Sequence, residues 1–410
     1  MANSQLTTDK ILMKALDILH AKLNFIGSVN RQYDDQFAQT GGKIGQTLRI
    51  RMPEKFSVTD GAVLDVQDST EQSQTLTLAT RKHVGMAFTT QELTMNIDEF
   101  TERKIEPAMS VLASVLEADA LNMVLDVPYV TGTFGTSPAT LDPFLKAKAI
   151  MNQNLAPRDD KRMALIPSHV TPTVIEGVKS LFNDSEEVKR QYKEGVMGRA
   201  AGFTWAENDL IPVSATGTRT GSITINGAAP TGSTISIKAL GANTGIKKGE
   251  VLTIAGYYAV HPETKAPYPH LQQFVVTADN SASGGGTTIA ALAISPAIVT
   301  SGPYQNVTGT PGSDAVVILK GGATTGGLAA SANASTNFAQ SICYHKNAFA
   351  FVSADLELPP NVEAFRRTQD GISMRIVRGY DIVNDLITSR LDVLYGYKTI
   401  RPELACRVTS

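Results

Sequence analysis

Several residue clusters in this chain have types that could do chemistry, but none has the spacing that a known mechanism needs. The glycine-rich segment Gly41–Gly45 contains a lysine, yet it lacks the GxxxxGK[ST] spacing whose backbone N–H groups wrap a phosphate. The sequence also contains neither the GxSxG turn of a serine nucleophile nor the HExxH pair of a zinc hydrolase. These patterns argue against nucleotide binding and against hydrolysis.

The histidines are scattered, and only His261 and His270, with Glu263 between them, share one proline-rich loop. Histidine and carboxylate side chains can together bind a transition metal, but loop histidines between prolines are more often simply exposed. Adjacent acidic residues such as Asp34 and Asp35 do not make an acid/base pair, because such pairs converge across a cleft. We therefore predict no catalytic residue, no metal and no cofactor, and the chain is expected not to be an enzyme.

The charge balance excludes a protein that holds nucleic acid through an overall basic field. Of 410 residues, 37 are Lys or Arg and 39 are Asp or Glu, so the formal net charge is −2. The two cysteines, Cys343 and Cys406, match no disulfide framework and no zinc spacing. A polar start and the lack of an apolar run of about 18 residues predict neither a secretion signal nor a membrane span. We expect reduced thiols and synthesis in the cytoplasm.

The first part of the chain predicts a helix, an extended arm and a long two-stranded excursion. Apolar residues from Leu12 to Ile26 recur at three- and four-residue steps after a candidate N-cap, Thr8. The polar, glycine-rich stretch Asn30–Gly45 has too few apolar residues for a core of its own. Alternating apolar residues at both ends of Thr47–Leu78 enclose a polar stretch and predict two paired strands.

The middle of the chain predicts a long helix and then alternating helices and strands. Apolar residues between Asp98 and Asp126 follow helical spacing, with Pro107 expected in the first turn or at a kink. Further elements are predicted in the order helix, strand, helix: Leu141–Asn154 after a Thr140 cap, Met163–Ile166, and Pro172–Phe182. This order is typical of an α/β or α+β domain.

Between Ser214 and Asn337 only ten residues are charged, where the average for the chain would supply about twice as many. Short alternating segments follow one another here: 223–226, 234–240, 251–255, 273–277, 288–294 and 315–319. They predict a six-stranded antiparallel barrel or sandwich. Because the helix-bearing pattern resumes only afterwards, this module is expected to be an insertion, with Gly321–Asn337 as its return linker. Closing strands are predicted at 349–352, 372–376 and within 382–397.

The order of these elements resembles that of the major capsid proteins of tailed double-stranded-DNA bacteriophages, in the coat-protein branch typified by a Salmonella short-tailed phage. Each resembling segment is modestly specific, but their order along nearly the whole chain is more so. These segments are Asn30–Pro53, His83–Leu93, Phe100–Ala113, Ala201–Val213, Thr244–Val260, Leu271–Asp279 and Arg390–Ala405.

The resemblance implies an α+β, Hong Kong-type capsid fold with a spine helix, an axial domain, an extended loop, an N-terminal arm and an inserted six-stranded antiparallel β-barrel. In the best-known member a long loop of the inserted domain reaches across a two-fold axis, whereas here only Ala228–Ser233 separates the first two strands. The implied parts are an N-terminal arm and helix at 1–46, an extended β-loop at 47–78, a peripheral domain with the spine helix at 79–140, an axial domain at 141–213, the inserted barrel at 214–337, and closing strands at 338–410.

The function implied is a major capsid protein that self-assembles, by way of a procapsid that matures on DNA packaging, into an icosahedral shell around the genome. Its expected partners are further copies in pentamers and hexamers, a scaffolding protein, a portal and packaged double-stranded DNA bound without sequence specificity, with no membrane and with the virion as location. Candidate subunit contacts are Arg51, Glu54, Lys55, Asp60, Asp34, Asp35 and Arg103. A secreted or surface adhesive β-rich protein is the alternative, and it would need a secretion signal and repeats.

Overall fold

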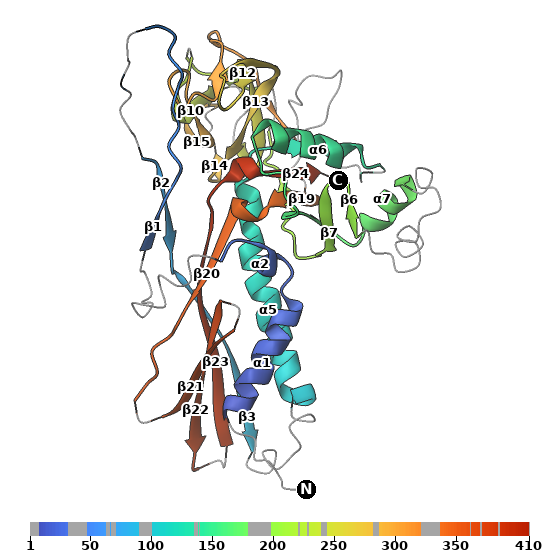
Figure 1. Cartoon of the computed structure of the whole chain (residues 1–410), viewed down its shortest axis with the longest axis vertical. Coiled ribbons are helices and arrows are strands. Elements are labelled where there is room, and N and C mark those ends of the chain that lie inside the picture. The colour runs from blue at the N-terminus through green and yellow to red at the C-terminus, as the bar shows by residue number, and fades with distance from the viewer. Residues whose placement is uncertain are drawn as a thin grey trace. The chain divides into compact units, whose positions relative to one another are not determined.

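The computed structural model describes residues 8–31, 47–62, 66, 71–89, 101–134, 138, 140–178, 198–219, 222–227, 229–238, 244–281, 287–320, 337–360, 362–369, 371–383 and 386–409. The chain divides into two compact units, which we describe one at a time (Figure 1). The first unit comprises residues 1–52, 73–121 and 349–400, and the second comprises residues 53–72, 122–348 and 401–410.

The first unit is built on an antiparallel sheet whose central strand is β23 (Leu386–Thr399). Along one edge of β23, residues 386–392 pair with β22 (Ile372–Asp381) and residues 394–399 pair with β20 (Phe349–Ala354). The outer edge of β22 pairs with β21 (Glu363–Gln369). Its other edge pairs with β3 (Thr80–Thr89) over ten residue pairs. The predicted strands at 349–352, 372–376 and within 382–397 are therefore present, whereas β3 and β21 had not been predicted.

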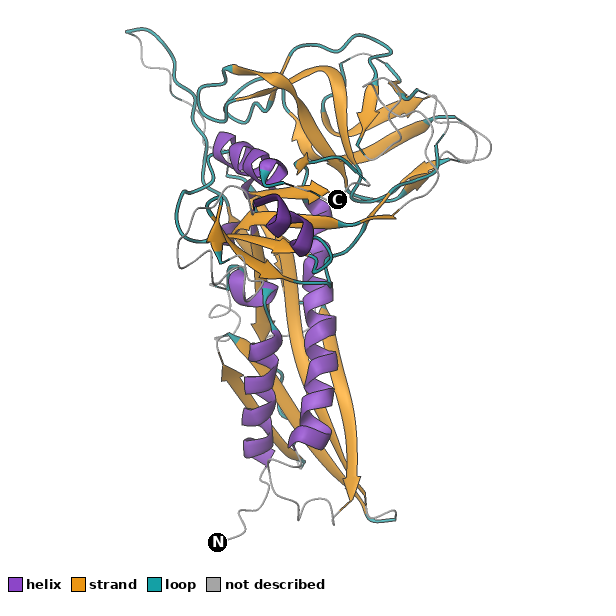
Figure 2. Cartoon of the chain, turned by 90° about the vertical axis from the view of Figure 1, so that its right-hand side faces the viewer, coloured by secondary structure: helices purple, strands orange, loops and turns teal. Residues whose placement is uncertain are grey.

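Two helices lie along one face of this sheet (Figure 2). They are α1 (Thr8–Lys22) and α5 (Glu106–Leu121), and α5 is flanked by a π-helical turn η2 (Thr101–Ile105) and a 3-10 turn η3 (Asn122–Asp126). The predicted apolar stripes of both helices are buried, because each helix turns them toward the core. Pro107 is the second residue of α5 and follows the π-helical turn η2 directly, so it stands where the helix changes from one type of turn to the other.

Helix α5 also binds the start of a short earlier helix, α2, through a buried carboxylate. Glu117 is 1% exposed and accepts hydrogen bonds from the backbone N–H groups of Phe25 and Ile26, the latter at 3.3 Å. These donors belong to the first turn of α2 (Phe25–Ser28), which has no side-chain cap of its own. An acidic group from another helix thus takes over the role of an N-cap residue.

The predicted two-stranded excursion begins as a paired ribbon. Strand β1 (Thr47–Arg51) pairs antiparallel with β2 (Ser73–Thr77), in register from Thr47 opposite Thr77 to Arg51 opposite Ser73. The ribbon packs on the sheet through a cluster that includes Ile50, Leu76 and Leu394. Gly396 permits this close approach, because a Cβ there would lie 2.4 Å from the carbonyl oxygen of Thr77.

The second unit contains a mixed six-stranded sheet in the order β4, β24, β19, β5, β7, β6. In that order, the strands are Val130–Thr131 (β4), Ala405–Thr409 (β24), Gln340–His345 (β19), Arg162–Ile166 (β5), Phe203–Glu207 (β7) and Arg199–Ala200 (β6). The unit also contains the helices α6 (Asp142–Gln153) and α7 (Thr171–Val178). The predicted Thr140 cap is wrong: Leu141 occupies the N-cap position of α6 without a side-chain bond. A proline in the first turn sets the helical φ there instead.

The remaining strands of the second unit lie between Ser214 and Phe338. Their entry and exit, β8 (Ser214–Ala215) and β18 (Asn337–Phe338), pair with each other, as do β11 (Gly245–Ile246) and β14 (Asn280–Ser281). The others are β9 (Thr224–Ile225), β10 (Gly232–Lys238), β12 (Val251–Val260), β13 (Pro267–Val276), β15 (Ile289–Ile298), β16 (Val307–Thr308) and β17 (Val317–Leu319). Most of the return linker predicted at Gly321–Asn337 lies outside the described residues.

Strand pairing in this segment runs round a ring. It passes from β9 to β10, β15, β13, β12 and β17, and the bridge between Thr224 and Val316 leads back to β9. One apolar cluster fills the ring with residues drawn entirely from Ile223 to Leu319. Each of the six predicted strand segments therefore coincides with one strand of the ring.

The proline-rich stretch predicted to be a loop is instead a hairpin. Tyr257 and Tyr258 lie in β12, and Tyr268 and His270 lie in β13, so only the connection around His261 is a turn. The imidazole Nδ1 of His261 accepts the backbone N–H groups of Glu263 and Thr264 at 3.2 Å. The rings of His261 and Tyr268 lie 6.2 Å apart and those of Tyr268 and His270 stack at 5.3 Å, so these side chains are neighbours on the hairpin.

One helical stretch, Arg103–Asp126, is long and apolar enough to span a membrane by length and composition. Half of its most apolar window is buried inside the protein. The buried side carries Met109, Leu112 and Leu116, which belong to the stripe that packs in the core. A core helix of a folded protein has these same properties.

We predict that Leu112→Ala destabilises the subunit by about 2 to 5 kcal/mol, because Leu112 is 2% exposed and its removal leaves a cavity. The neighbouring Val111→Ala is the matched control, since Val111 is 62% exposed and its truncation should change stability by less than about 0.5 kcal/mol. Denaturant unfolding of the soluble subunit measures both. Equal effects of the two substitutions would show that the α5 stripe is not core.

Candidate assembly surfaces

The predicted contact residues fall into separate places. Asp34 and Asp35 lie outside the described residues. In the first unit Arg51 ends β1 and Arg103 lies in η2, and both side chains are exposed. The remaining three, Glu54, Lys55 and Asp60, share the segment that follows β1 and clusters with the second unit. Glu54, Lys55 and Asp60 are thus close to one another along the chain, on one described segment.

This segment, residues 53–62, which we call the acidic loop, exposes large apolar side chains. Phe56 is 65% exposed and Val58 is 95% exposed. The ammonium nitrogen of Lys55 lies 5.8 Å from the centroid of the Tyr304 ring, within the range of a cation–π contact. Apolar side chains this exposed on neighbouring positions are typical of a surface that another protein covers.

Three arginines from three strands converge on one buried carboxylate in the first unit. Asp392, in β23, is fully buried, and its Oδ2 accepts hydrogen bonds from Arg81 at 3.1 Å and Arg375 at 2.6 Å. Its Oδ1 accepts one from Nε of Arg390 at 2.7 Å. Because residues opposite one another in a sheet share a face, the register also places His83 on this face. The cluster carries more positive than negative charge.

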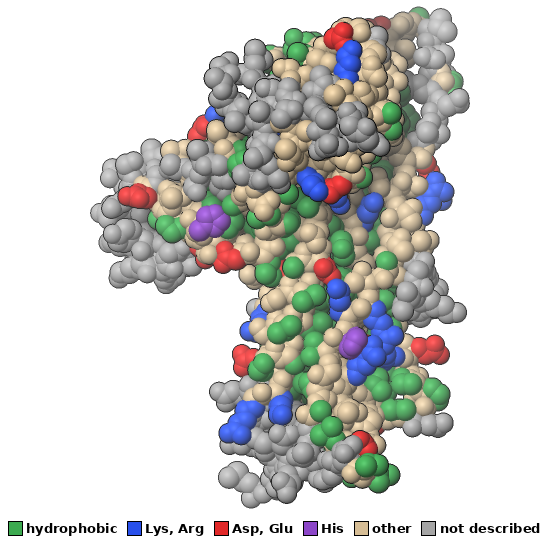
Figure 3. Space-filling model, turned by 180° about the vertical axis from the view of Figure 1, so that it is seen from behind, with side chains coloured by type: hydrophobic (Ala, Val, Ile, Leu, Met, Phe, Trp, Pro, Cys, Tyr) green, Lys and Arg blue, Asp and Glu red, His purple; other side chains and the backbone are tan. Residues whose placement is uncertain are grey.

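The environment of Asp392 keeps its carboxylate ionised. Burial by itself raises its pKa, but the hydrogen bonds from Arg375, Arg390 and Arg81 outweigh burial and leave the pKa below its usual value. Beside the cluster, the sheet surface is hollowed into an open groove of about 580 Å³ whose lining includes Gly85, Ala87 and Gly379. Figure 3 shows Lys and Arg side chains gathered beside a histidine on the lower part of the molecule. We call the surface formed by Arg81, His83, Arg375, Arg390 and the adjoining groove the basic sheet face.

A further exposed apolar site lies at the turn between β22 and β23. Tyr380 is 56% exposed, Ile382 is 83% exposed and Val383 is 89% exposed. The sequence did not predict this site, because the apolar pattern from Ile382 to Tyr397 indicates a strand that begins at Ile382. The signal available was the pair of apolar residues that directly precedes the polar residues Asn384 and Asp385 in the sequence.

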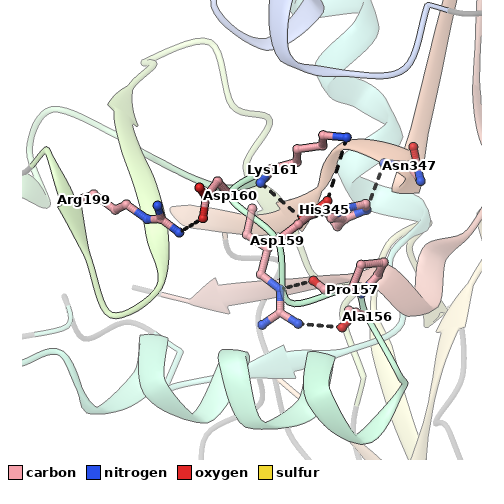
Figure 4. Close-up of polar contacts among 9 residues, drawn as sticks. Ala156, Pro157, Asp159, Asp160, Lys161, Arg199, His345 and Asn347 are labelled. Atoms are coloured by element: carbon pink, nitrogen blue, oxygen red, sulfur yellow. Dashed lines mark hydrogen bonds and ion pairs between the residues drawn. The ribbon is translucent and has the colours of Figure 1, made fainter.

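One histidine–aspartate pair has the composition of an acid/base site (Figure 4). His345 is buried, and its Nε2 lies 3.1 Å from Oδ1 of Asp159, while its Nδ1 accepts the backbone N–H of Asn347 at 3.2 Å. The proton therefore resides on Nε2, and both ring nitrogens are used. Nearby, Arg162 donates to the carbonyl oxygens of Pro157 at 2.8 Å and Ala156 at 2.7 Å. These contacts fasten a loop to the sheet rather than activate a nucleophile.

The other residues with chemical potential are structural in their surroundings. Cys343 and Cys406 stand opposite each other in β19 and β24 as free, buried thiols, and burial raises the pKa of both, that of Cys406 to about 12. Trp205 packs edge-on against Phe144 and donates its indole N–H to the Ala200 carbonyl at 2.9 Å. Among the described residues no group of His, Cys, Asp and Glu could hold a metal ion.

The chain matches the family described as "P22 coat protein - gene protein 5" over residues 1–407. The comparison with curated proteins found no match. Among solved structures the chain is similar to one from Mycobacterium phage Che8, with 11% identity, TM-score 0.46 and coverage of 94% of this chain and 90% of that one. It is also similar to the capsid of Cyanophage P-SCSP1u, with 10% identity, TM-score 0.40 and coverage of 90% and 84%. Because these structural likenesses are distant, the family match carries the identification.

We predict that Asp392→Asn costs about 3 kcal/mol at neutral pH, because it leaves three guanidinium groups without their buried carboxylate. The folded-state pKa lies below the unfolded value, so this stabilisation is present above about pH 4 and is lost as the pH falls through the folded pKa. Urea unfolding at several pH values measures the difference in the free energy of unfolding between the variant and the natural protein. Asp60→Asn, at an exposed position, is the control. A difference that stays constant as the pH is lowered would contradict the ion-pair account.

Proposed function

The chain belongs to the P22 coat protein family and is a major capsid protein that forms the shell of a bacteriophage virion, and we propose that it does so as pentamers and hexamers of an icosahedral procapsid that matures when double-stranded DNA is packaged. The observation that supports this proposal is the match to one coat-protein family over residues 1–407. We further propose synthesis in the host cytoplasm and assembly with a scaffolding protein and a portal. The family match does not favour the alternative of a secreted adhesive protein.

Packaged DNA is proposed to be held by confinement rather than by affinity. The net charge of −2 provides no overall attraction for a polyanion. A nearly neutral subunit also suits a shell, because many like-charged copies at close distance would repel one another. The DNA contact is therefore expected to be weak and independent of sequence.

We propose that the acidic loop contacts a neighbouring subunit. Within the acidic loop Glu54 and Asp60 are acidic and Lys55 is basic, and the stretch 63–72 that follows adds three acidic residues and no basic one. Phe56 and Val58 are exposed within the loop. The basic sheet face of a second copy offers the complementary charge around Arg390 and an open groove. Many such weak contacts add up in a closed shell by avidity.

We propose that residues 214–337 are an inserted barrel domain that acts in folding and in the spacing of subunits. The ring of strand pairings and the apolar cluster confined to Ile223–Leu319 support this proposal. A closed ring leaves few strand edges exposed to pair with other chains. This matters for a protein that reaches high local concentration during assembly.

Purified subunits mixed with their scaffolding protein are expected to form particles of tens of nanometres. Sedimentation and electron microscopy measure this. A protein that stays monomeric under every assembly condition would contradict the proposed function.

Deleting Lys55–Ser69 is predicted to leave a folded subunit that cannot form shells, because the deletion removes the exposed apolar and acidic side chains of the loop. Circular dichroism checks folding and sedimentation checks assembly. A finer test reverses charges: Asp60→Lys should weaken assembly, and Arg390→Glu on the same chain should restore part of it if the two surfaces meet. Because Arg390→Glu also removes a partner of the buried Asp392, urea unfolding of the Arg390→Glu variant alone must first show that it folds. Normal shells from the deletion would rule out the proposed contact.

The segment 214–337 expressed alone is predicted to fold, because its apolar cluster uses none of the remaining chain. Dispersed amide NMR signals and a cooperative thermal transition are the expected results. A random-coil spectrum would show that the segment depends on its attachment to the rest of the second unit.

A further inference from the structure

The inserted segment makes more buried contacts with the rest of the second unit than its glycine-rich sequence had led us to expect. These contacts gather at the turn Lys247–Glu250, directly before β12. On the side of the barrel, Asp279 accepts the backbone N–H of Lys248 at 2.7 Å and pairs with the Lys247 ammonium at 3.1 Å. The backbone N–H of Gly249 donates to the carbonyl of Val276 at 2.8 Å. The turn is therefore part of the barrel.

A buried ion pair ties the entry of the insertion to the same turn. Arg219 and Glu250 are both fully buried, and the guanidinium donates to Oε2 of the carboxylate. The other oxygen of Glu250 accepts the backbone N–H groups of Gly217 at 2.7 Å and Lys247 at 2.8 Å. Every position on this turn is thus fixed relative to the barrel.

From the other side, the C-terminal strand β24 reaches the turn through Arg407. This side chain is 1% exposed, and its Nη2 donates to the carbonyl oxygen of Gly249 at 2.8 Å. Its Nη1 donates to Oε1 of Gln340, in β19, at 3.4 Å. Both acceptors are neutral, and burial lowers the pKa of Arg407 to about 10. A buried guanidinium whose two acceptors are both neutral is costly, so packing alone does not explain why this arginine is placed here.

Other contacts beside Arg407 leave no room between the two parts. A Cβ on Gly249 would lie 3.0 Å from Cδ2 of Leu125, and Lys248 forms an ion pair with Asp126 at 3.1 Å. The side-chain amide of Gln273, in β13, accepts the N–H of Val130 at 2.7 Å and donates to its carbonyl at 3.3 Å. Val130 also packs with Val251 and Val275. By contrast, β8 and β18 pair over only two residues each.

We infer that Arg407 is the positioning residue that clamps the inserted barrel to the mixed sheet of the second unit, so that the two move as one body. The covalent connection through β8 and β18 is too short a ribbon to resist swinging by itself. The Gly249 carbonyl is the point at which the clamp acts, because the turn that carries it is fixed to the barrel. This has a consequence that rests on the proposed function. In an assembled shell, the orientation of each barrel is set by the orientation of the sheet to which it is clamped.

The test compares Arg407→Met with Arg407→Lys in the full-length, unassembled subunit by hydrogen exchange and mass spectrometry. Amides at the joint, in Lys247–Val251 and β4, are expected to exchange about tenfold faster or more in Arg407→Met, because the side chain keeps an unbranched apolar stem but loses the guanidinium and both of its hydrogen bonds. Amides in the core strands β12, β13 and β15 should keep their protection. Arg407→Lys retains the charge and one donor, so it should fall between.

Arg199→Met is the matched control, because Arg199 is a half-exposed arginine of the same unit whose pairing with Asp160 lies outside the joint. It should leave exchange at the joint unchanged. Faster exchange of the barrel core together with the joint, or failure of both Arg407 variants to fold, would show that Arg407 serves overall stability and would overturn the inference. Unchanged exchange at the joint in Arg407→Met would overturn it as well. Because these measurements need no shell, they stand apart from the outcome of the assembly test.

Discussion

Both units are closed by strands from the last part of the chain, and the rest of the structure depends on this long-range pairing. In the first unit β23 pairs with β3, more than three hundred residues earlier, and the ion pair between Arg81 and Asp392 spans 311 positions. In the second unit β24 pairs with β19 and with β4. Contacts between residues so far apart form only after much chain entropy has been lost, so folding is expected to be slow. The segment 214–337 lengthens the separation between β4 and β24, and the pairing of β8 with β18 offsets part of that cost.

Buried charges are concentrated where distant segments must meet in one arrangement. Asp392 gathers arginines from β3, β22 and β23, and Arg219 with Glu250 fixes the entry of the insertion. Replacing such groups by apolar residues of equal volume is often neutral or stabilising in other proteins, so their contribution here is better sought in specificity. An unsatisfied charge penalises every misaligned alternative. For a subunit that must present the same surfaces in every copy, that selectivity matters more than a further gain in stability.

The exposed apolar side chains show the opposite arrangement. Four of the most exposed large apolar side chains among the described residues, Phe56, Val58, Ile382 and Val383, lie on the acidic loop and at the turn between β22 and β23. Apolar residues at such tips favour association, and on a free subunit they are also a hazard for aggregation. Acidic neighbours such as Asp60 and Asp381 keep these tips soluble and restrict the surfaces on which they can settle. The balance is the one expected of a protein that must remain soluble before assembly and associate during it.

The sequence by itself determined the elements whose signal is local. The helical stripes of α1 and α5, the ribbon β1–β2 and the six strand segments of the ring could be predicted because their periodicity depends on nearby residues alone. Of the candidate contacts, Glu54, Lys55 and Asp60 were found on one segment because they are neighbours in the chain. The tertiary structure alone decided the partners of β3, β19 and β24, the hydrogen bond from Arg407 to the Gly249 carbonyl, and the basic face around Asp392. An isolated arginine or aspartate shows no sign in the sequence of which charge it will meet, because burial and pairing arise only when segments hundreds of residues apart are brought together.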